Sequence, residues 1–195
     1  MKNLPDILTR KVKLEGFTPI MFDRYSGDNK TSLPVERKMY FLPDGRSLCI
    51  PAANISSFLS AKNTTSVAKL IGGRGFKSLA DAMLGFVQIE PYLIPLARND
   101  EAIVFNGFQD GHDAISNIYV DKRVARLDKG IPNPKERPVV ELPWELSFTI
   151  RLFRNDVIDE IQLKTAFKLG GMAIGIGTYR GLFGKFSVVE WREVR

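Results

Sequence analysis

The sequence contains very little cysteine and histidine. Cys49 and His112 are the single representatives of their types among 195 residues. A disulfide within the chain is therefore impossible, and so is a tetrahedral zinc site built of thiolates. A metal site would have to consist of carboxylates, but the sequence has no D-x-D-x-D-G calcium loop. We therefore expect neither a metal nor a redox cofactor.

Long apolar runs are also missing. The first residues, MKNLPDILTRKVKL, contain no apolar stretch of signal-peptide length, and nothing in the chain approaches the roughly 18 apolar residues of a membrane span. The sequence has no G-x-x-x-x-G-K-[ST] phosphate loop, which argues against an ATPase. We expect a cytoplasmic protein with no membrane partner.

The composition is that of an ordinary globular chain, with 44% hydrophobic and 26% charged residues. A length of 195 residues suits one core rather than two, so we expect a single domain spanning residues 1–195. Lysine and arginine exceed aspartate and glutamate by 28 to 22, for a net charge of +6. A positive surface favours polyanionic partners, although many mildly basic proteins have none.

Alternation of polar and apolar residues predicts several strands. Residues 10–17 alternate basic and apolar side chains, and residues 144–154 place Leu146, Phe148, Ile150 and Leu152 on one side. Further strands are expected at residues 101–108, 115–127 and 185–194, and a hairpin at residues 37–50 around Asp44 and Gly45. Turn formers predict loops at residues 19–34 and 129–138.

Helical patterns alternate with these strands. They cover parts of residues 52–73 and 77–86, and a third helix is expected to begin at Asn155 or Asp156 and to end at Gly170. The mixture predicts an α+β fold with helices on one face of an antiparallel sheet.

The most specific segment is the glycine-rich stretch GGMAIGIGTYRGLFGKFSVV, residues 170–189. Glycines let backbone N–H groups approach a phosphate closely, and the interleaved Tyr179, Arg180 and Lys185 add charge and a stacking surface. The alternative is a tightly packed turn whose glycines only supply positive φ. The stretch precedes an expected strand, so it does not match the dinucleotide-binding motif, which opens a helix.

A strand, a helix and then a loop of form GxxxGIGxxRxxxGxFxV resemble the carboxyl-terminal signature of the RAMP superfamily, the ferredoxin-like RNA-binding subunits of CRISPR effector complexes. KVKLEGFTPIMF followed by IPAANISSFL is similar to the first strand and first helix of backbone subunits in that superfamily. The resemblance implies a ferredoxin-like (RRM-like) sheet with the glycine-rich loop before the last strand. It also implies nucleic-acid contacts at Gly175, Gly177, Arg180, Gly184 and Lys185, and at Arg24 and Lys30 in the loop after the first strand.

Two other groups of residues complete the predicted binding surface. Lys122, Arg123 and Arg126 form a basic run that is either a phosphate-tracking patch or a solvated strand end. Tyr25 and Tyr179 offer rings on which bases can stack. We predict binding of single-stranded RNA, or of DNA, without sequence readout. The expected partners are further copies of the chain or other subunits of a ribonucleoprotein complex.

Two alternatives remain at this point. A metal-independent ribonuclease of the repeat-processing type would use His112 or a tyrosine as the proton-transfer group, although a histidine in a polar turn is more often simply solvated. A viral structural or inhibitory protein would keep the same shape in order to imitate a CRISPR subunit. Some backbone subunits of the superfamily cut RNA with a carboxylate in the loop after the first strand; we interpret Asp23 and Asp28 there as loop residues and favour a binding protein over an enzyme.

Overall fold

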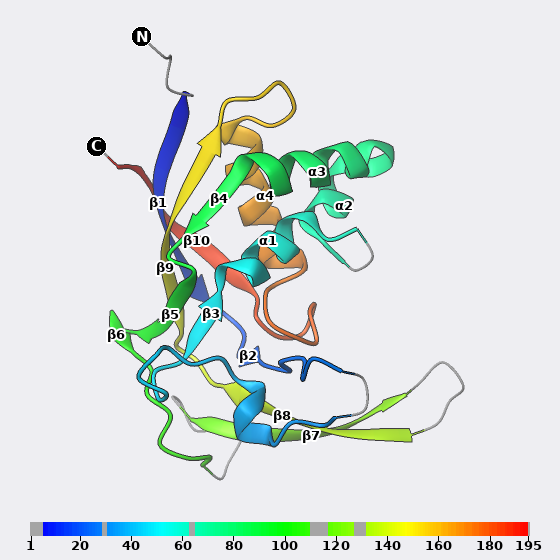
Figure 1. Ribbon diagram of the computed structural model, residues 1–195, viewed down its shortest axis with the longest axis vertical. Coiled ribbons are helices and arrows are strands. Elements are labelled where there is room, and N and C mark those ends of the chain that lie inside the picture. The colour runs from blue at the N-terminus through cyan, green and yellow to red at the C-terminus, as the bar shows by residue number, and fades with distance from the viewer. Residues whose placement is uncertain (1–5, 29–30, 63–64, 110–116, 127–131, 195) are drawn as a thin grey trace.

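The computed structural model describes residues 6–28, 31–62, 65–109, 117–126 and 132–194. Within these residues the main sheet is antiparallel and has seven strands in the order β10-β1-β9-β5-β3, with β4 beside β9 and β6 beside β5 (Figure 1). Its strands are β1 (Ile7–Gly16), β3 (Cys49–Pro51), β4 (Val87–Glu90), β5 (Leu93–Arg98), β6 (Glu101–Ala102), β9 (Glu145–Phe153) and β10 (Phe186–Glu193).

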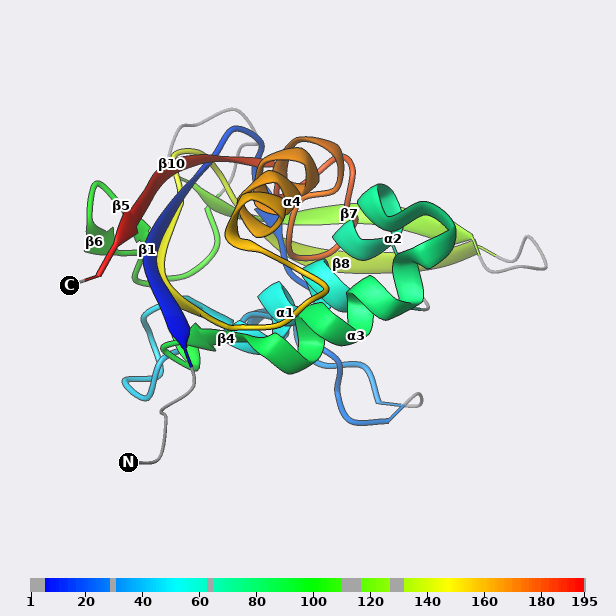
Figure 2. The same ribbon diagram turned by 90° about the horizontal axis from the view of Figure 1, so that it is seen from above.

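The helices pack on one face of this sheet (Figure 2). They are α1 (Ala52–Ser60), α2 (Val67–Gly72), α3 (Phe76–Phe86) and α4 (Glu160–Ala173), with 3₁₀ turns η1 (Val35–Lys38) and η2 (Gly73–Gly75). Three helices lie between β1 and β4 in the chain, and α4 lies between β9 and β10. With β1 and β9 in the centre of the sheet, this is the ferredoxin-like arrangement that the sequence predicted.

The core lies between the sheet and the helices. Leu146, Phe148, Ile150 and Leu152 of β9 are all buried, which confirms the alternation expected for this strand. Phe167 of α4 packs against them, 6.1 Å from Phe148 between ring centroids.

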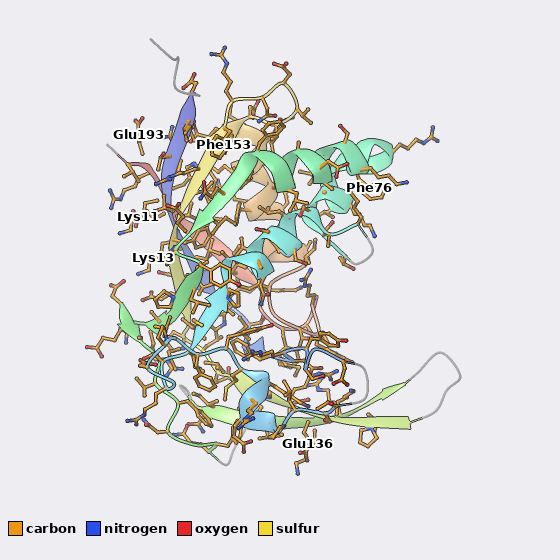
Figure 3. All side chains as sticks on the ribbon, viewed as in Figure 1. Lys11, Lys13, Phe76, Glu136, Phe153 and Glu193 are labelled. Carbon is orange, nitrogen blue, oxygen red and sulfur yellow. The ribbon has the colours of Figure 1, made fainter. Side chains whose placement is uncertain are left out.

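The opposite face of the main sheet is polar along its centre. Lys11 and Lys13 of β1 point away from the helices (Figure 3). Their register partners on β9 are Thr149 and Ser147. RRM domains bind RNA by stacking bases on aromatic residues of this face, and these central positions carry none.

A smaller antiparallel sheet completes the fold, in the order β2-β8-β7. It consists of β2 (Ile20–Met21), β7 (Ile118–Arg126) and β8 (Pro132–Val140), and the β7–β8 ribbon projects from the body of the molecule (Figure 1). The prediction of a proline-rich loop at residues 129–138 is therefore wrong over residues 132–138, which belong to β8. Pro132, Pro134 and Pro138 are separated by even numbers of residues, so their backbone groups point to the same side of the strand. The Pro138 carbonyl accepts a hydrogen bond from Phe22 N, which shows that this side faces away from β7. The backbone nitrogen of each of these prolines therefore lies on the side of β8 away from β7. A proline has no N–H to donate, but the hydrogen bonds between β8 and β7 do not need one at these positions, so the prolines do not interrupt the pairing.

Three other local expectations differ from the structure. The first arm of the hairpin at residues 37–50 contains η1, and a single bridge joins Phe41 to Leu48. Of residues 101–108, only the first two form a strand. Helix α4 begins one turn later than expected, because Asp159 and Gln162 form a capping box, whereas Asn155 accepts hydrogen bonds in the preceding turn.

Candidate nucleic-acid interface

The glycine-rich loop after α4 packs against the segment that follows β1. Thr178 N donates to Met21 O at 2.9 Å, and Gly184 N donates to Pro19 O at 2.7 Å. A Cβ atom on Gly177 would lie 2.6 Å from Met21 O, and one on Gly184 would lie 1.8 Å from Ile176 O. Both glycines have positive φ, of 83° and 71°. Gly177 and Gly184 therefore permit the close packing of the loop, and nucleic-acid contacts at these glycines stay a prediction.

Gly175 serves the same packing, because its Cβ would lie 2.7 Å from the carbonyl of Gly184, at a φ of 80°. The backbone N–H groups of Gly177 and Tyr179 have no hydrogen-bond partner among the described residues. These two donors remain available to a ligand at the tip of the loop.

Arg180 turns toward the helical layer. Its Nη1 donates to Thr65 O at 2.9 Å, just before α2, and burial lowers the pKa of the guanidinium. The nucleic-acid contact expected at Arg180 needs an accessible guanidinium, but this side chain is half-buried. Arg180 joins the glycine-rich loop to the segment before α2.

Tyr179 stands in the opposite direction, over the β7–β8 ribbon. The residue is 44% exposed, and its backbone has a φ of 55°. A tyrosine in the left-handed region costs free energy, and such outliers cluster at functional positions. The guanidinium of Arg123 lies 5.4 Å from the Tyr179 ring centroid and 5.1 Å from that of Phe183, and the two rings are 6.2 Å apart. Arg123 thus connects β7 to the glycine-rich loop.

The two faces of the ribbon differ in charge. The register pairs Asp121 with Arg137 and Arg123 with Lys135, so these four residues share the face that carries Tyr179, which we call the inner face. A hydrogen bond from Arg123 to the buried carboxylate of Asp121 raises the pKa of the guanidinium. Lys122 lies on the other face and pairs with Glu136 at 2.9 Å. The predicted basic run is therefore divided between two surfaces.

Asp23 links the inner face to the loop after β2. Its Oδ2 accepts a hydrogen bond from Arg137 Nε at 2.8 Å, and its Oδ1 lies 3.9 Å from Lys38 Nζ. The Arg137 guanidinium lies 6.0 Å from the centroid of Tyr179. Lys38 is only 6% exposed and donates to Glu136 O at 2.6 Å. This aspartate therefore holds two cations in place.

A cavity of about 240 Å³ adjoins this network. Arg24 and Tyr25 line it together with Lys38 and Lys135. The guanidinium of Arg24 also lies 5.6 Å from the ring centroid of Tyr40. The structure thus brings Arg24, Tyr25, Arg123 and Tyr179 into one region, through contacts of Asp23 and Arg137.

Lys38, Lys135 and Arg137 belong to this region but were not among the predicted site residues. For Lys135 and Arg137 the missing signal was the strand period of β8, hidden by the prolines. For Lys38, no local pattern indicates that a lysine on a 3₁₀ turn is buried.

The other predicted residues are placed as follows. Lys185 is half-buried, and its backbone N–H donates to Thr18 Oγ1 at 2.9 Å. Arg126 ends β7, and its side chain lies outside the described part of the structure. Lys30 and His112 lie outside the described residues.

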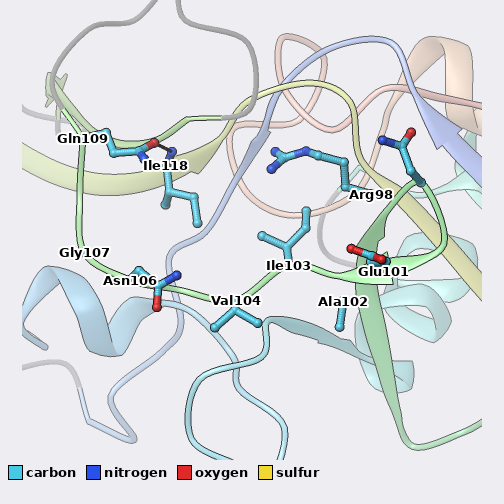
Figure 4. Close-up of a pocket in the computed structure, with 10 residues that line it drawn as sticks. Arg98, Glu101, Ala102, Ile103, Val104, Asn106, Gly107, Gln109 and Ile118 are labelled. Carbon is cyan, nitrogen blue, oxygen red and sulfur yellow. Dashed lines mark hydrogen bonds between the residues drawn. The ribbon is translucent and has the colours of Figure 1, made fainter.

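A separate cavity of about 420 Å³ contains none of these residues (Figure 4). Arg98 extends along it, with Ile103 and Ile118 as apolar walls (Figure 4). The Arg98 side chain donates to the carbonyls of Pro143 and Glu141, and burial lowers its pKa.

Among the residues that the structure describes, there is no group of three or more histidine, cysteine or acidic side chains that could hold a metal ion. In the same part of the chain, no helix is both long and apolar enough to cross a membrane.

The fold and the inner face together define a ferredoxin-like α+β chain that carries cations and aromatic rings between its glycine-rich loop and a projecting ribbon. A similar fold occurs in a chain of the cryo-EM structure of the Type III-B Cmr-beta bound to cognate target RNA, with a TM-score of 0.58 and 14% sequence identity. The match covers 97% of the present chain and 61% of that chain. No protein-family model and no curated protein sequence matches.

Proposed function

We propose that this chain is a single-stranded-RNA-binding subunit of a ribonucleoprotein complex, resembling the backbone subunits of CRISPR effector complexes in the RAMP superfamily. In this proposal residues 1–195 act as one binding domain and assemble in several copies or with other subunits. Single-stranded DNA is the second ligand to test. The fold shared with a chain of an RNA-bound Cmr assembly supports the proposal.

The observation that carries the proposal is the stack of Arg123 on Tyr179 and Phe183, beside Arg137. Exposed aromatic rings next to cations bind single strands without reading their sequence, because every base has a π-face and every nucleotide has a phosphate. Asp121 and Asp23 keep the two guanidinium groups oriented.

The predicted residues divide into two groups in this proposal. Arg24, Tyr25, Arg123 and Tyr179 contact the RNA directly, and Lys30, Arg126 and Lys185 add phosphate contacts. Gly175, Gly177, Gly184 and Arg180 hold the loop that presents Tyr179. Lys122, on the other face of the ribbon, makes no contact.

The test is fluorescence anisotropy with a labelled unstructured RNA between 50 and 200 mM salt. With six to ten phosphate contacts, affinity should fall by about 10³-fold to 10⁵-fold over this range. An affinity that does not change with salt would contradict phosphate binding. Measuring the assembly size and the 260 to 280 nm absorbance ratio of the purified protein tests for co-purified nucleic acid.

Arg123→Ala and Lys122→Ala form a matched pair, because both remove one positive charge from adjacent positions on opposite faces of β7. Arg123→Ala should weaken RNA binding by about 1 to 3 kcal/mol and reduce the salt slope by nearly one. Lys122→Ala should bind as the parent does. Equal effects of the two substitutions would show attraction by net charge alone and would overturn the assignment of the inner face.

A further inference from the structure

The cavity beside Asp23 has a feature that the sequence did not indicate, a buried lysine among other cations. Lys38 is 6% exposed, and its Nζ is held by Glu136 O at 2.6 Å and by Asp23 Oδ1 at 3.9 Å. An ammonium group has three N–H donors, and the Glu136 carbonyl accepts one of them. Asp23 Oδ1 at 3.9 Å makes an ion pair beyond hydrogen-bond distance, so two donors have no acceptor among the described residues. Burying a charged group is costly unless its hydrogen-bonding capacity is met.

Two further cations line the same cavity. Lys135 forms no ion pair with any carboxylate among the described residues, and neither does Arg24. Lys135 reaches the cavity from the inner face of β8, and Arg24 reaches it from the loop after β2. The three positive groups therefore come from three separate segments of the chain, namely η1, β8 and this loop.

The acidic residues that line the cavity cancel only part of this charge. Asp23 is occupied by Arg137, whose Nε donates to it at 2.8 Å. The side chain of Asp28 accepts hydrogen bonds from the backbone N–H and the hydroxyl of Thr31. With Arg137 counted against Asp23, and Asp28 counted against one of the three cations Lys38, Lys135 and Arg24, the lining still has a net positive charge.

Hydroxyl groups of Ser26, Thr31 and Ser32 complete the polar lining. Those of Ser26 and Thr31 donate to Asp28, so Ser32 offers the hydroxyl donor that has no acceptor among the described residues. A phosphate group has several strong acceptor oxygens, each able to accept more than one hydrogen bond. Ammonium, guanidinium and hydroxyl donors that converge on a space of about 240 Å³ match this chemistry. A hydrophobic ligand does not suit such a lining.

We propose that the cavity formed by Arg24, Lys38 and Lys135 is a phosphate-binding pocket, in which Lys38 is the fixed donor at the base. The inference rests on the proposed function in one respect, because we assign the phosphate to RNA. The pocket adds a defined phosphate site to an RNA-binding surface that otherwise acts through base stacking and through charge spread over several residues. The bound group is either a phosphodiester of the strand or a terminal phosphate at its 5′ end, and both present the same acceptor oxygens.

The first experiment uses inorganic phosphate as the probe, titrated into the intact protein at constant ionic strength and followed by isothermal calorimetry. The parent should bind phosphate with saturation. Lys135→Ala removes a cation that no carboxylate holds, so the fold should persist while phosphate binding weakens by about tenfold. Lys122→Ala is the matched control, since it lies on the opposite face of the same ribbon, and it should bind phosphate as the parent does.

Lys38→Met tests the base of the pocket while keeping a long side chain at the buried position. It should abolish saturable phosphate binding. If this variant does not fold, Lys135→Ala alone still decides the inference. Absence of saturable phosphate binding in the parent, or equal binding by Lys135→Ala and the parent, overturns it.

The second experiment distinguishes the two sources of phosphate. RNA with a 5′-phosphate and RNA with a 5′-hydroxyl are compared for binding to the parent and to Lys135→Ala. A preference of the parent for the 5′-phosphate that is lost in Lys135→Ala assigns the pocket to a strand end. Equal affinity for the two RNAs, with an equal loss in Lys135→Ala, assigns it to the phosphodiester backbone.

Failure of this inference is separable from failure of the proposed function. Salt-dependent RNA binding that is unchanged in Lys135→Ala overturns the pocket and leaves the RNA-binding proposal intact. Phosphate binding without any RNA binding supports the pocket and overturns the RNA-binding proposal.

Discussion

The guanidinium of Arg123 lies 5.4 Å from the centroid of the Tyr179 ring, while its Nε donates to both carboxylate oxygens of Asp121. One arginine thus connects a strand of the ribbon to the tip of the glycine-rich loop. The contact holds the ring of a tyrosine that is 44% exposed and whose backbone conformation tyrosine rarely adopts. Rigid presentation of this ring to a ligand is the clearest functional feature of the inner face.

The first prediction concerns this ring. Tyr179→Ala should weaken binding of unstructured RNA by about 1 to 3 kcal/mol, because a stacking surface is lost. Tyr179→Phe keeps the ring and should bind as the parent does. Anisotropy titrations at a fixed salt concentration measure both effects. If folded Tyr179→Ala binds RNA as tightly as the parent does, bases do not stack on the Tyr179 ring.

The second prediction concerns Arg180 and follows from its hydrogen bond to Thr65 O. Arg180→Ala should lower the free energy of unfolding by about 1 kcal/mol, since the loop loses its connection to the segment before α2. Its effect on RNA affinity should be smaller than that of Arg123→Ala. Urea denaturation gives the first quantity and anisotropy the second. An unchanged free energy of unfolding together with a large loss of RNA affinity would show instead that Arg180 binds phosphate directly.

A third prediction tests the close packing of the glycine-rich loop. Gly184→Ala places a Cβ atom 1.8 Å from Ile176 O at a φ of 71°, and should destabilise the protein by at least about 2 kcal/mol. Gly85→Ala in α3 is the control, because its Cβ meets no atom within 4 Å. This control should be neutral or stabilising by up to about 1 kcal/mol. Similar melting temperatures for the two variants would contradict the tight contact.

The fourth prediction is a pH dependence at the start of α4. The Arg10 side chain donates two hydrogen bonds to the carboxylate of Glu160, and Trp191 Nε1 donates a third, which together lower the pKa of Glu160. A lowered folded-state pKa gives stability that is present above the ordinary value of 4.5 and is lost as pH falls through the folded value.

Glu160→Gln should therefore be less stable than the parent at pH 7, by about 1 to 2 kcal/mol. The difference should narrow as the pH falls below 4.5 and through the lower folded pKa of Glu160, where the parent carboxylate takes up its proton. Thermal unfolding of both proteins across this pH range measures the difference in stability. Glu193→Gln is the control, because Glu193 is 69% exposed and lies 3.6 Å from Arg10. A difference that does not change with pH would show that charge on Glu160 is unimportant.

The fifth prediction uses the single cysteine. Cys49 is fully buried in β3, and burial raises the pKa of its thiol to about 11. The thiolate is the reactive form, so the native protein should react very slowly with a disulfide reagent at pH 8. When denaturant is added, one thiol per chain should become reactive toward the reagent, at the rate at which the protein unfolds. Fast reaction under native conditions would show that the β3 edge opens readily.

The sequence predicted the elements whose side-chain period is undisturbed. Leu146 to Leu152 alternate without interruption, and β9 lies where expected because burial on one face imposes that period. The strand β8 could not be predicted in the same way, because Pro132 and Pro134 are ordinary loop signals. Their effect depends on which edge of the strand is paired, and only the tertiary structure determines this.

The candidate site was predictable only in part for a similar reason. Arg24, Arg123 and Tyr179 were recognised as basic or aromatic residues in exposed segments, and the fold brings them together. That Lys122 and Arg123 point to opposite faces follows from the strand period, but Lys38 becomes a buried donor only because η1 packs on β8. Contacts between segments distant in the chain have no local signal.

The alternate prolines of β8 also determine how other molecules can approach the ribbon. Only Val139 and Val140 of β8 pair with β2, so the rest of this edge has no strand beside it in the described structure. At every proline on that edge the amide donor that an added strand would need is absent. A strand added at this edge therefore lacks most of its hydrogen-bond donors, and a neighbouring molecule that approaches the β8 edge must recognise it mainly through side chains.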